Sequence, residues 1–457
     1  MKRIKHAKAA DQYIHKSAHP KAQHVAAIHL RNKRDRAVTV IDEWEELRET
    51  ASKIKLHTLS NLHGYLEEFE ANAKANGVII HWAQTGDDLN KIVYELLDER
   101  NVPYLVKSKS MLTEECHMNQ YLEERGIDVY DTDLGERIVQ LAKEPPSHIV
   151  VPAMHKTKEE ISDLFHKTMN TEKDNVDAKY LTLAARKDLR TKFMNAEAAL
   201  TGVNFGVAET GTVTIVTNEG NADLGVNKAK LQIHCMGIEK LIPKLNDLSV
   251  FLRLLGRSAT GQPITTYSSH YHKPKPEGEM HIVIVDNGRS DHLGMEDFWT
   301  ALKCIRCGAC MNTCPVYRSG GGHSYGYTVP GPIGSIITPA RDITQYDDLP
   351  FASSLCGSCS DVCPVKIDIH GQLLKWREVI VESGQVAKSK SLPMKIGSTV
   401  LSKGQWYRLS GWGARKFLNY FPKLANAMVP KWTKGRELPN PPKESFREWY
   451  IKNKKNG

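Results

Sequence analysis

Short apolar segments alternate with amphipathic ones from about residue 77 to residue 167. The apolar segments predict buried strands at Val78–Ala83, Pro103–Val106, Ile127–Tyr130 and His148–Pro152. Apolar residues at helical spacing predict helices at Gly86–Arg100, Thr113–Arg125, Asp133–Ala142 and Thr157–Lys167. Short strands separated by helices in this way favour an open, mostly parallel sheet that is covered on both faces.

The next part of the chain mixes helices with a hairpin. The predicted elements are a helix from Ala178 to about Leu200, strands Val203–Ala208 and Thr212–Thr217 around the turn Glu209-Thr210-Gly211, a helix near Pro243–Arg257, and a strand at Met280–Val285. The fold class predicted from the whole pattern is α/β plus a small α+β part.

Both ends of the chain are basic. The first 50 or so residues carry Lys, Arg and five histidines, and the segment beyond about residue 390 combines basic with aromatic residues. The formal net charge of +9 is compatible with an acidic partner, with anionic lipid, or with a surface that simply keeps the protein in solution. The histidines follow no ligand spacing and are interpreted as surface residues.

The sequence also bears on the compartment. No apolar run approaches the roughly 18 residues of a membrane span, and the N-terminal residues lack the apolar core of a secretory signal. Clustered cysteines fit a reducing environment. We therefore expect a cytoplasmic protein, with peripheral contact at the inner membrane face as an open alternative.

Seven of the nine cysteines lie in two groups between residues 304 and 363. The groups are Cys304-x2-Cys307-x2-Cys310-x3-Cys314-Pro315 and Cys356-x2-Cys359-x3-Cys363-Pro364. In two-cluster bacterial ferredoxins, three cysteines of one loop bind one cubane iron–sulfur cluster and the fourth binds the other cluster. By that rule cluster one takes Cys304, Cys307, Cys310 and Cys363, and cluster two takes Cys314, Cys356 and Cys359. A structural zinc site is the less favoured interpretation.

The second group is one cysteine short. Ser353 stands where a complete copy of the motif would have a cysteine, three residues before Cys356. Cluster two is then either a three-iron cluster or a four-iron cluster. In a four-iron cluster the last iron would take Ser353, Ser354, His323, water or a group from a partner.

Other residues near the clusters carry weaker signals. Lys303 and Arg306 flank the ligands and are interpreted either as tuning or docking charges or as ordinary surface charge. Cys116 and Cys235 lie outside the two groups and are expected to be core residues.

A small anion pocket is predicted in the α/β domain. In an open parallel sheet, ligands bind beyond the carboxyl ends of the strands. Two predicted ends are cationic, which favours a carboxylate or phosphate there. The proposed lining residues are Lys107, Ser108, Lys109, His155 and Lys156, with Glu209 and Asn221 as further candidates. The alternative is exposed loop lysines with capping serines.

The chain resembles the lactate utilization protein B family. The matching segments are His57–Leu59, Gly64–Glu67, His81–Ala83, Val106–Glu115, Asp131–Glu136, Pro145–Thr157, Ala208–Thr212, Asn218–Asn221 and Asp286–Ser290, together with both cysteine groups. The resemblance covers nearly the whole chain and is weakest at its two ends.

The resemblance implies a LUD-type α/β domain, similar to sugar-phosphate isomerases and coenzyme A transferases, followed by a ferredoxin-type module for two [4Fe-4S] clusters. It also implies a non-catalytic electron-transfer subunit of an NAD-independent complex that oxidises L-lactate to pyruvate. The partners would be a cysteine-rich-domain subunit and a cluster-free LUD-domain subunit. No catalytic residue and no cofactor beyond the clusters is predicted.

Four domains are expected from pattern and resemblance together. They are a basic helical N-terminal segment (1–55), the LUD-like domain (56–292), the iron–sulfur domain (293–390) and a basic aromatic C-terminal domain (391–457). Two other functions stay open. One is a self-sufficient 2-hydroxy-acid oxidoreductase, which the missing Gly-x-Gly-x-x-Gly fingerprint disfavours. The other is a nucleic-acid protein with a structural cluster, which is the least favoured of the three.

Overall fold

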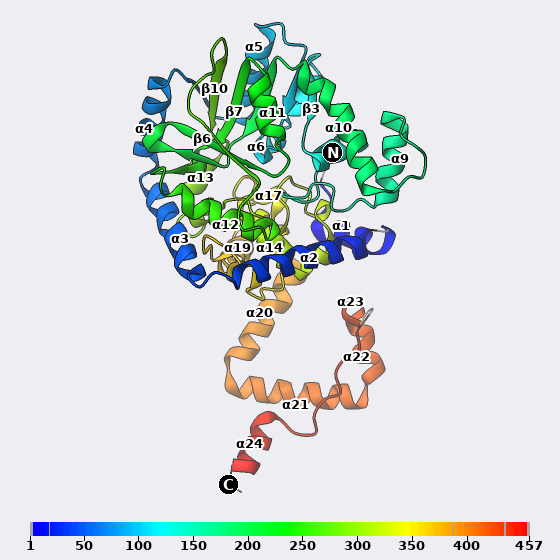
Figure 1. The fold of residues 1–457 in the computed structure, drawn as a ribbon. Coiled ribbons are helices and arrows are strands. Elements are labelled where there is room, and N and C mark those ends of the chain that lie inside the picture. Colours follow the sequence, from blue (N-terminus) through cyan, green and yellow to red (C-terminus); the bar gives the residue numbers. More distant parts are fainter. Residues whose placement is uncertain (1–2, 18, 387, 434–435, 455–457) are drawn as a thin grey trace. The chain divides into compact units, whose positions relative to one another are not determined.

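The computed structural model describes residues 3–17, 19–386, 388–433 and 436–454. The chain forms two compact units, residues 1–379 and 380–457. Figure 1 labels the helices and strands of both units.

A six-stranded parallel sheet is the centre of the first unit. In spatial order its strands are β1 (Ile79–Ala83), β10 (Glu279–Val285), β7 (Leu231–Gly237), β4 (Ala198–Gly202), β2 (Tyr104–Lys107) and β3 (Asp128–Asp131). Neighbouring strands run parallel throughout. The apolar run of β10 is buried on both faces, as expected for a central parallel strand. The α/β prediction is confirmed.

Helices cover both faces of this sheet (Figure 1). They are α4 (Leu62–Ala75), α5 (Gly86–Asp98), α6 (Met111–Glu115), α7 (Met118–Glu123), α8 (Leu134–Ala142), α10 (Ala178–Met194) and α11 (Asn221–Lys228). A further helix, α9 (Lys158–Met169), packs on α8 and α10. Successive residues of β10 face opposite cores, because strand side chains alternate. Val283 packs in the core that holds Leu89 and Leu97 of α5, and Ile284 packs in the core that holds Phe69 of α4.

A second, four-stranded sheet carries the predicted hairpin. Its order is β8 (Leu241–Ile242), β5 (Phe205–Val207), β6 (Thr212–Thr217) and β9 (Tyr267–Tyr271). The short helix η1 (Ala208–Thr210) joins β5 to β6, and η2 (Ile238–Lys240) and α12 (Leu248–Thr260) flank β8. Gly211 closes the turn at φ +65°, where a Cβ would lie 2.3 Å from the Ala73 nitrogen. Glycine is therefore required there.

Two sequence predictions fail in this region. His148–Pro152 is not a strand but an irregular segment. His148 and Ser147 in this region bind Asn312 and Tyr317 of the iron–sulfur module instead of a sheet neighbour. The long helix predicted to end near Leu200 ends at Met194, and the alanine-rich residues after it form β4, because they enter the sheet between β7 and β2.

The iron–sulfur module is mostly short helices. They are α13 (Arg289–Leu293), η3 (Trp299–Lys303), α14 (Ala309–Thr313), α15 (Pro315–Gly320), η4 (His323–Tyr325), α16 (Gly331–Ile337), α17 (Ile343–Tyr346), η5 (Leu349–Phe351), α18 (Ser358–Asp361) and α19 (Ile369–Glu382). Large side chains such as Tyr317 and Tyr325 are fully buried among them.

The N-terminal helices α1 (His6–Lys16), α2 (Pro20–Val38) and α3 (Trp44–Ser60) pack on this module. Arg48 donates to the carbonyl oxygens of Cys363 (3.0 Å) and Asp361 (2.6 Å). Arg34 donates to that of Val362 (3.2 Å). Part of the N-terminal basic charge is thus used for packing, and the prediction that all five histidines are surface residues is wrong for His6, which is buried.

The second unit consists of helices. They are α20 (Lys388–Ser402), α21 (Gly404–Tyr420), α22 (Pro422–Met428), α23 (Pro430–Thr433) and α24 (Phe446–Lys454). An ion pair between Arg415 and Glu448 (3.1 Å) joins α21 to α24. Many large apolar side chains here are exposed, including Trp412 and Phe446. Across the described parts of both units, no helix combines the length and apolar character that a membrane span requires.

Candidate iron–sulfur site and the adjoining cavity

Four thiols of the cysteine groups surround one small cavity. Cys304, Cys307, Cys310 and Cys363 line a space of about 20 Å³ whose other walls are mainly apolar, with Ile333 among them. Burial raises the pKa of the Cys310 thiol, and the neighbouring Cys304 and Cys307 raise it further. Four sulfur donors thus converge on one point from two separate stretches of chain.

Backbone N–H groups point at these sulfurs. The Arg306 nitrogen lies 3.4 Å from Cys304 Sγ, and the Ile367 nitrogen lies 3.4 Å from Cys363 Sγ. Arg306 (φ +59°) and Gly308 (φ +75°) turn the chain on either side of Cys307. Such N–H···S bonds stabilise the thiolates of iron–sulfur clusters and tune their potential. The donor set therefore fits a cubane cluster.

The remaining three cysteines form a second group. Burial raises the pKa of Cys359 to about 12, and the charges of Cys314 and Cys356 raise it further. Cys356 is exposed, in contrast to Cys314 and Cys359. Within the described residues, no three Cys, His, Asp or Glu side chains are arranged to share a single metal ion. A cubane cluster spreads its thiolates over four separate irons.

The two cysteine loops repeat each other at an offset of 49 residues (353 − 304 = 356 − 307 = 359 − 310). Leu355 (φ +55°) and Gly357 (φ +80°) flank Cys356 as Arg306 and Gly308 flank Cys307. The Leu355 N–H donates to Ser353 Oγ at 3.0 Å, which is the counterpart of the bond from Arg306 to Cys304 Sγ. Ser353 Oγ thus takes the position of the missing sulfur.

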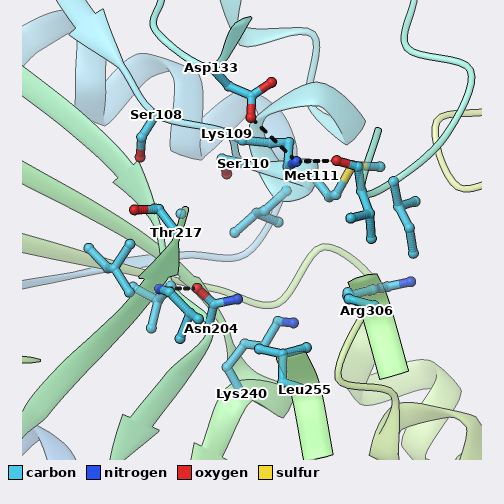
Figure 2. A pocket seen from close by; sticks show the side chains of 18 of the residues that line it. Ser108, Lys109, Ser110, Met111, Asp133, Asn204, Thr217, Lys240, Leu255 and Arg306 are labelled. Atoms are coloured by element: carbon cyan, nitrogen blue, oxygen red, sulfur yellow. Dashed lines mark hydrogen bonds and ion pairs between the residues drawn. The ribbon is translucent and has the colours of Figure 1, made fainter. Parts of the chain in front are cut away.

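A larger cavity of about 270 Å³ lies beyond the carboxyl ends of β2, β4 and β7, as the parallel sheet leads one to expect. Its walls come from both sheets, from the segment around Val150 and from Arg306 of the first cysteine loop. Figure 2 shows Ser108, Lys109 and Asp133 on one side of this cavity and Lys240 and Arg306 on the other. The cavity therefore joins the α/β domain to the loop that holds Cys304 and Cys307.

The charged groups of the cavity differ in their partners. Lys109 Nζ donates to the Val150 carbonyl oxygen at 2.8 Å and lies 3.7 Å from Asp133. At the cavity mouth, burial of the carboxyl group and the nearby Asp133 charge raise the pKa of Glu219 to about 7, although the residue as a whole is exposed. Burial lowers the pKa of Lys240. Its ammonium makes no hydrogen bond or ion pair with the described residues.

A buried ion network closes the cavity on the side of the iron–sulfur module. Glu115 lies 3.0 Å from Arg289, 3.5 Å from Arg341 and 3.7 Å from Arg306. Arg289 also binds Glu239 at 2.7 Å. Burial alone would raise the pKa of Glu239, but the charges of Arg289, Lys240 and Arg306 together outweigh it and lower this pKa to about 2.

The structure brings together only some of the residues predicted for the anion pocket. Ser108, Lys109 and Asn221 line the cavity. Lys107 does not, because its side chain is fully buried and paired with Asp131 (2.6 Å) and Glu114 (2.9 Å). Burial lowers the pKa of Lys107, but the charges of these carboxylates have the larger effect and raise this pKa well above its usual value.

His155, Lys156 and Glu209 also lie outside the cavity. His155 and Lys156 both bind Glu144, at 2.8 and 2.6 Å. Glu209 accepts a hydrogen bond from the Leu245 N–H at 2.9 Å and borders a separate open hollow near His270.

Sequence analysis missed Lys240 as a cavity residue and identified Arg306 only as a neighbour of the clusters. The sequence indicates a strand at Cys235 but does not give the bounds of β7, because Gln232 and His234 interrupt its apolar run. Predicting those bounds would have placed Lys240 at a carboxyl end, where ligands bind.

Three family models match the chain. They are a LUD domain (residues 66–290), a 4Fe-4S dicluster domain (300–367) and the C-terminal region of lactate utilisation protein B (375–455). The chain therefore contains an iron–sulfur domain of the two-cluster ferredoxin type after its α/β domain.

Curated relatives match over almost the full length. "Lactate utilization protein B" of Bacillus cytotoxicus is 44% identical over 94% of this chain and 93% of its own. "Lactate utilization protein B 2" of Bacillus mycoides has the same values, and a Bacillus cereus relative is 43% identical. A solved structure of a DUF162 family protein from Deinococcus radiodurans covers 49% of this chain and 98% of its own. Its identity is 11% and its TM-score is 0.27, too low to support an argument. On the near full-length similarity to the curated relatives, this chain belongs to the lactate utilization protein B family.

Proposed function

We propose that this chain is the iron–sulfur electron-transfer subunit of a multi-protein complex that oxidises L-lactate to pyruvate. The observation that carries the proposal is the set of four thiols around one cavity, together with a second cysteine loop of the same backbone geometry within the same compact unit. When bound there, iron–sulfur clusters supply one-electron transfer. The lactate assignment rests on the names of the curated relatives.

We base the proposed partners on the family and the proposed cellular compartment on the sequence. The partners are a cysteine-rich-domain subunit and a cluster-free LUD-domain subunit. The proposed compartment is the cytoplasm, where thiols remain reduced. The chain's own contribution is to hold the clusters apart from water on one side and to present them to partners on the other.

The test combines cluster analysis with reconstitution. Anaerobically purified chain is expected to contain seven or eight irons with matching sulfide and two distinct electron paramagnetic resonance signals. L-lactate should reduce these clusters only when both partner subunits are present. Cluster reduction by lactate with the isolated chain would instead support the self-sufficient oxidoreductase. A colourless, iron-free and folded protein would refute both.

The proposed ligands of cluster one are Cys304, Cys307, Cys310 and Cys363. Those of cluster two are Cys314, Cys356, Cys359 and, as the fourth ligand, the Ser353 oxygen. The repeated backbone geometry and the matched N–H bond support Ser353 over its neighbours. His323 is a weaker candidate, because its Nε2 donates to the Pro145 carbonyl oxygen at 2.8 Å.

The serine assignment has a direct test by Mössbauer and electron paramagnetic resonance spectroscopy. Wild type should hold a four-iron cluster two, and Ser353→Ala should reduce it to three irons. Ser353→Cys should restore four irons with a changed potential. Ser354→Ala, one residue away, is the matched control and should behave as wild type. A three-iron cluster two in wild type, or an unaltered one in Ser353→Ala, would contradict the assignment.

A further inference from the structure

Two cations, Lys240 and Arg306, line the 270 Å³ cavity and share one nearby carboxylate, that of Glu239, which Arg289 already binds. Lys240 makes no ion pair with the described residues. Arg306 Nη1 is buried and has no hydrogen-bond partner in the part of the chain that the structure describes. Its Nη2 lies 3.7 Å from Glu115, which Arg289 already binds at 3.0 Å. Two neighbouring, half-buried cations are unfavourable unless an anion lies between them.

The nearest carboxylates do not balance this charge, because Glu115 and Glu239 together face four cations, Lys240, Arg289, Arg306 and Arg341. Glu115 and Glu239 are both bound by Arg289, at 3.0 and 2.7 Å. Asp133 and Glu219 lie with Lys109 at the other side of the cavity, where Asp133 caps α8 and Glu219 accepts a hydrogen bond from the Leu134 N–H. The end with Lys240 and Arg306 therefore keeps a positive charge.

Neutral polar atoms in the cavity are also unpartnered. The hydroxyl oxygens of Ser108 and Thr217 are buried and make no hydrogen bond within the described residues. Figure 2 shows these two side chains on the same side of the cavity, away from Lys240. Since buried polar atoms are normally paired, unpaired hydroxyls in a cavity indicate a bound molecule or water. The remaining walls are largely apolar, with Leu255 and Val203 among the lining residues.

We infer that this cavity binds a short hydroxy- or oxo-carboxylate, whose carboxylate lies between Lys240 and Arg306 and whose other oxygen faces Ser108 and Thr217. The cavity is large enough for such an acid and too small for a nucleotide or flavin, since the volume is about 270 Å³ and sites for drug-sized ligands span roughly 300–1,000 Å³. The proposed electron-transfer role does not require the chain itself to bind a small molecule.

An anion bound at this site would also change the reduction potential of cluster one. Arg306 lies between Cys304 and Cys307, and its own N–H bonds Cys304 Sγ. An anion that pairs with the Arg306 guanidinium removes positive charge from beside that thiolate, and cluster potentials respond to nearby charge. Binding should therefore lower the potential of cluster one and leave cluster two unchanged.

Isothermal titration calorimetry of the anaerobically purified holoprotein with L-lactate, pyruvate, acetate, lactamide and inorganic phosphate tests the inference. Lactate or pyruvate should bind, lactamide should fail because it lacks the charge, and acetate should bind more weakly because it lacks the second oxygen. Lys240→Met and Arg306→Gln should weaken binding about tenfold or more, since each removes a charge-assisted hydrogen bond. Lys244→Met, on an exposed lysine four residues away, is the control and should bind as wild type.

A redox titration followed by electron paramagnetic resonance gives a second readout. L-lactate or pyruvate should lower the reduction potential of cluster one in wild type and in Lys244→Met. The same concentration should not change this potential in Lys240→Met. Equal affinity of wild type and Lys240→Met, or binding of phosphate in preference to lactate and pyruvate, would overturn the inference. These measurements are independent of lactate oxidation by the complex, so the binding site and the proposed function can fail separately.

Discussion

The two cysteine loops have the same backbone turns but different surroundings. Cys307 in the first loop is buried, and Cys363, the distant member of its group, has its carbonyl oxygen held by the N-terminal Arg48. Cys356, the counterpart of Cys307 in the second loop, is exposed, and Ser353 replaces a cysteine. The same local motif therefore occurs once in a buried setting and once in an exposed one. The buried loop is suited to an internal cluster beside the cavity, and the exposed loop is suited to exchange with a partner.

The largest expected difference between the two loops is the loss of stability when one thiol is removed from each. Cys307→Ala is expected to lose cluster one and to destabilise the whole first unit, because its loop packs against Val150 and His148 of the α/β domain. Cys356→Ala should lose only cluster two and leave the thermal unfolding of the rest nearly unchanged. Iron counting and differential scanning calorimetry under anaerobic conditions measure both effects. Equal destabilisation by the two variants would show that the loops do not differ in this way.

Two arginines that hold a proposed ligand of each cluster, Cys363 for cluster one and Ser353 for cluster two, offer a second comparison. Arg48 is 8% exposed and binds two carbonyl oxygens. Arg377 is half-buried and binds those of Pro350 (2.9 Å) and Ser353 (2.7 Å). Arg48→Ala should cost about 3 kcal/mol, because buried carbonyls lose charged donors, and Arg377→Ala about 1 kcal/mol, because water can replace the guanidinium. Urea unfolding of the two variants measures the difference, and a larger loss for Arg377→Ala would reverse the interpretation.

A pH dependence that involves His148, beside the first loop, gives a further comparison. Burial lowers the pKa of His148 to about 3, so the unfolded state, whose histidine titrates near 6.5, binds more protons below that pH. The stability that neutral His148 contributes is complete above pH 6.5 and falls as the pH drops towards 3, by up to about 1.4 kcal/mol per unit. The physical reason is that Nδ1 accepts from the N–H groups of Val150 and Val151 and cannot do so when protonated.

Urea unfolding between pH 7 and pH 5.5 measures this dependence. His148→Gln should reduce the slope in part, because the buried His234 and His155, whose pKa values burial lowers to about 3 and about 4, contribute the rest. His370→Gln should not, because His370 lies beside the second loop, exposed and bonded to Ser360. An unchanged slope in His148→Gln would exclude this histidine as the source.

Local patterns explain what the sequence could predict. The cysteine spacing is visible within each loop, although Ser353 stands for one cysteine in the second. The strands of the parallel sheet are short apolar runs between helices with clear capping residues, such as Thr85 before α5. Features of this kind depend on neighbours in sequence, so they can be inferred without the fold.

Long-range pairing explains what could not be predicted. Lys107 was expected to face a ligand, but whether a lysine at a strand end is free or buried depends on Asp131 and Glu114. Arg34 and Arg48 look like ordinary helix surface charges until their carbonyl acceptors, more than 300 residues away, are known. The cavity residues Lys240 and Arg306 come together only because the iron–sulfur module docks on the carboxyl ends of the sheet.

The same long-range pairing has a consequence for biosynthesis. The bonds from Arg34 and Arg48 span 328 and 315 residues. At ribosomal rates of about 5–20 residues per second, these helices emerge roughly 15–65 seconds before their acceptors exist. These two arginines can therefore reach their final packing only after the cysteines of both groups have been translated.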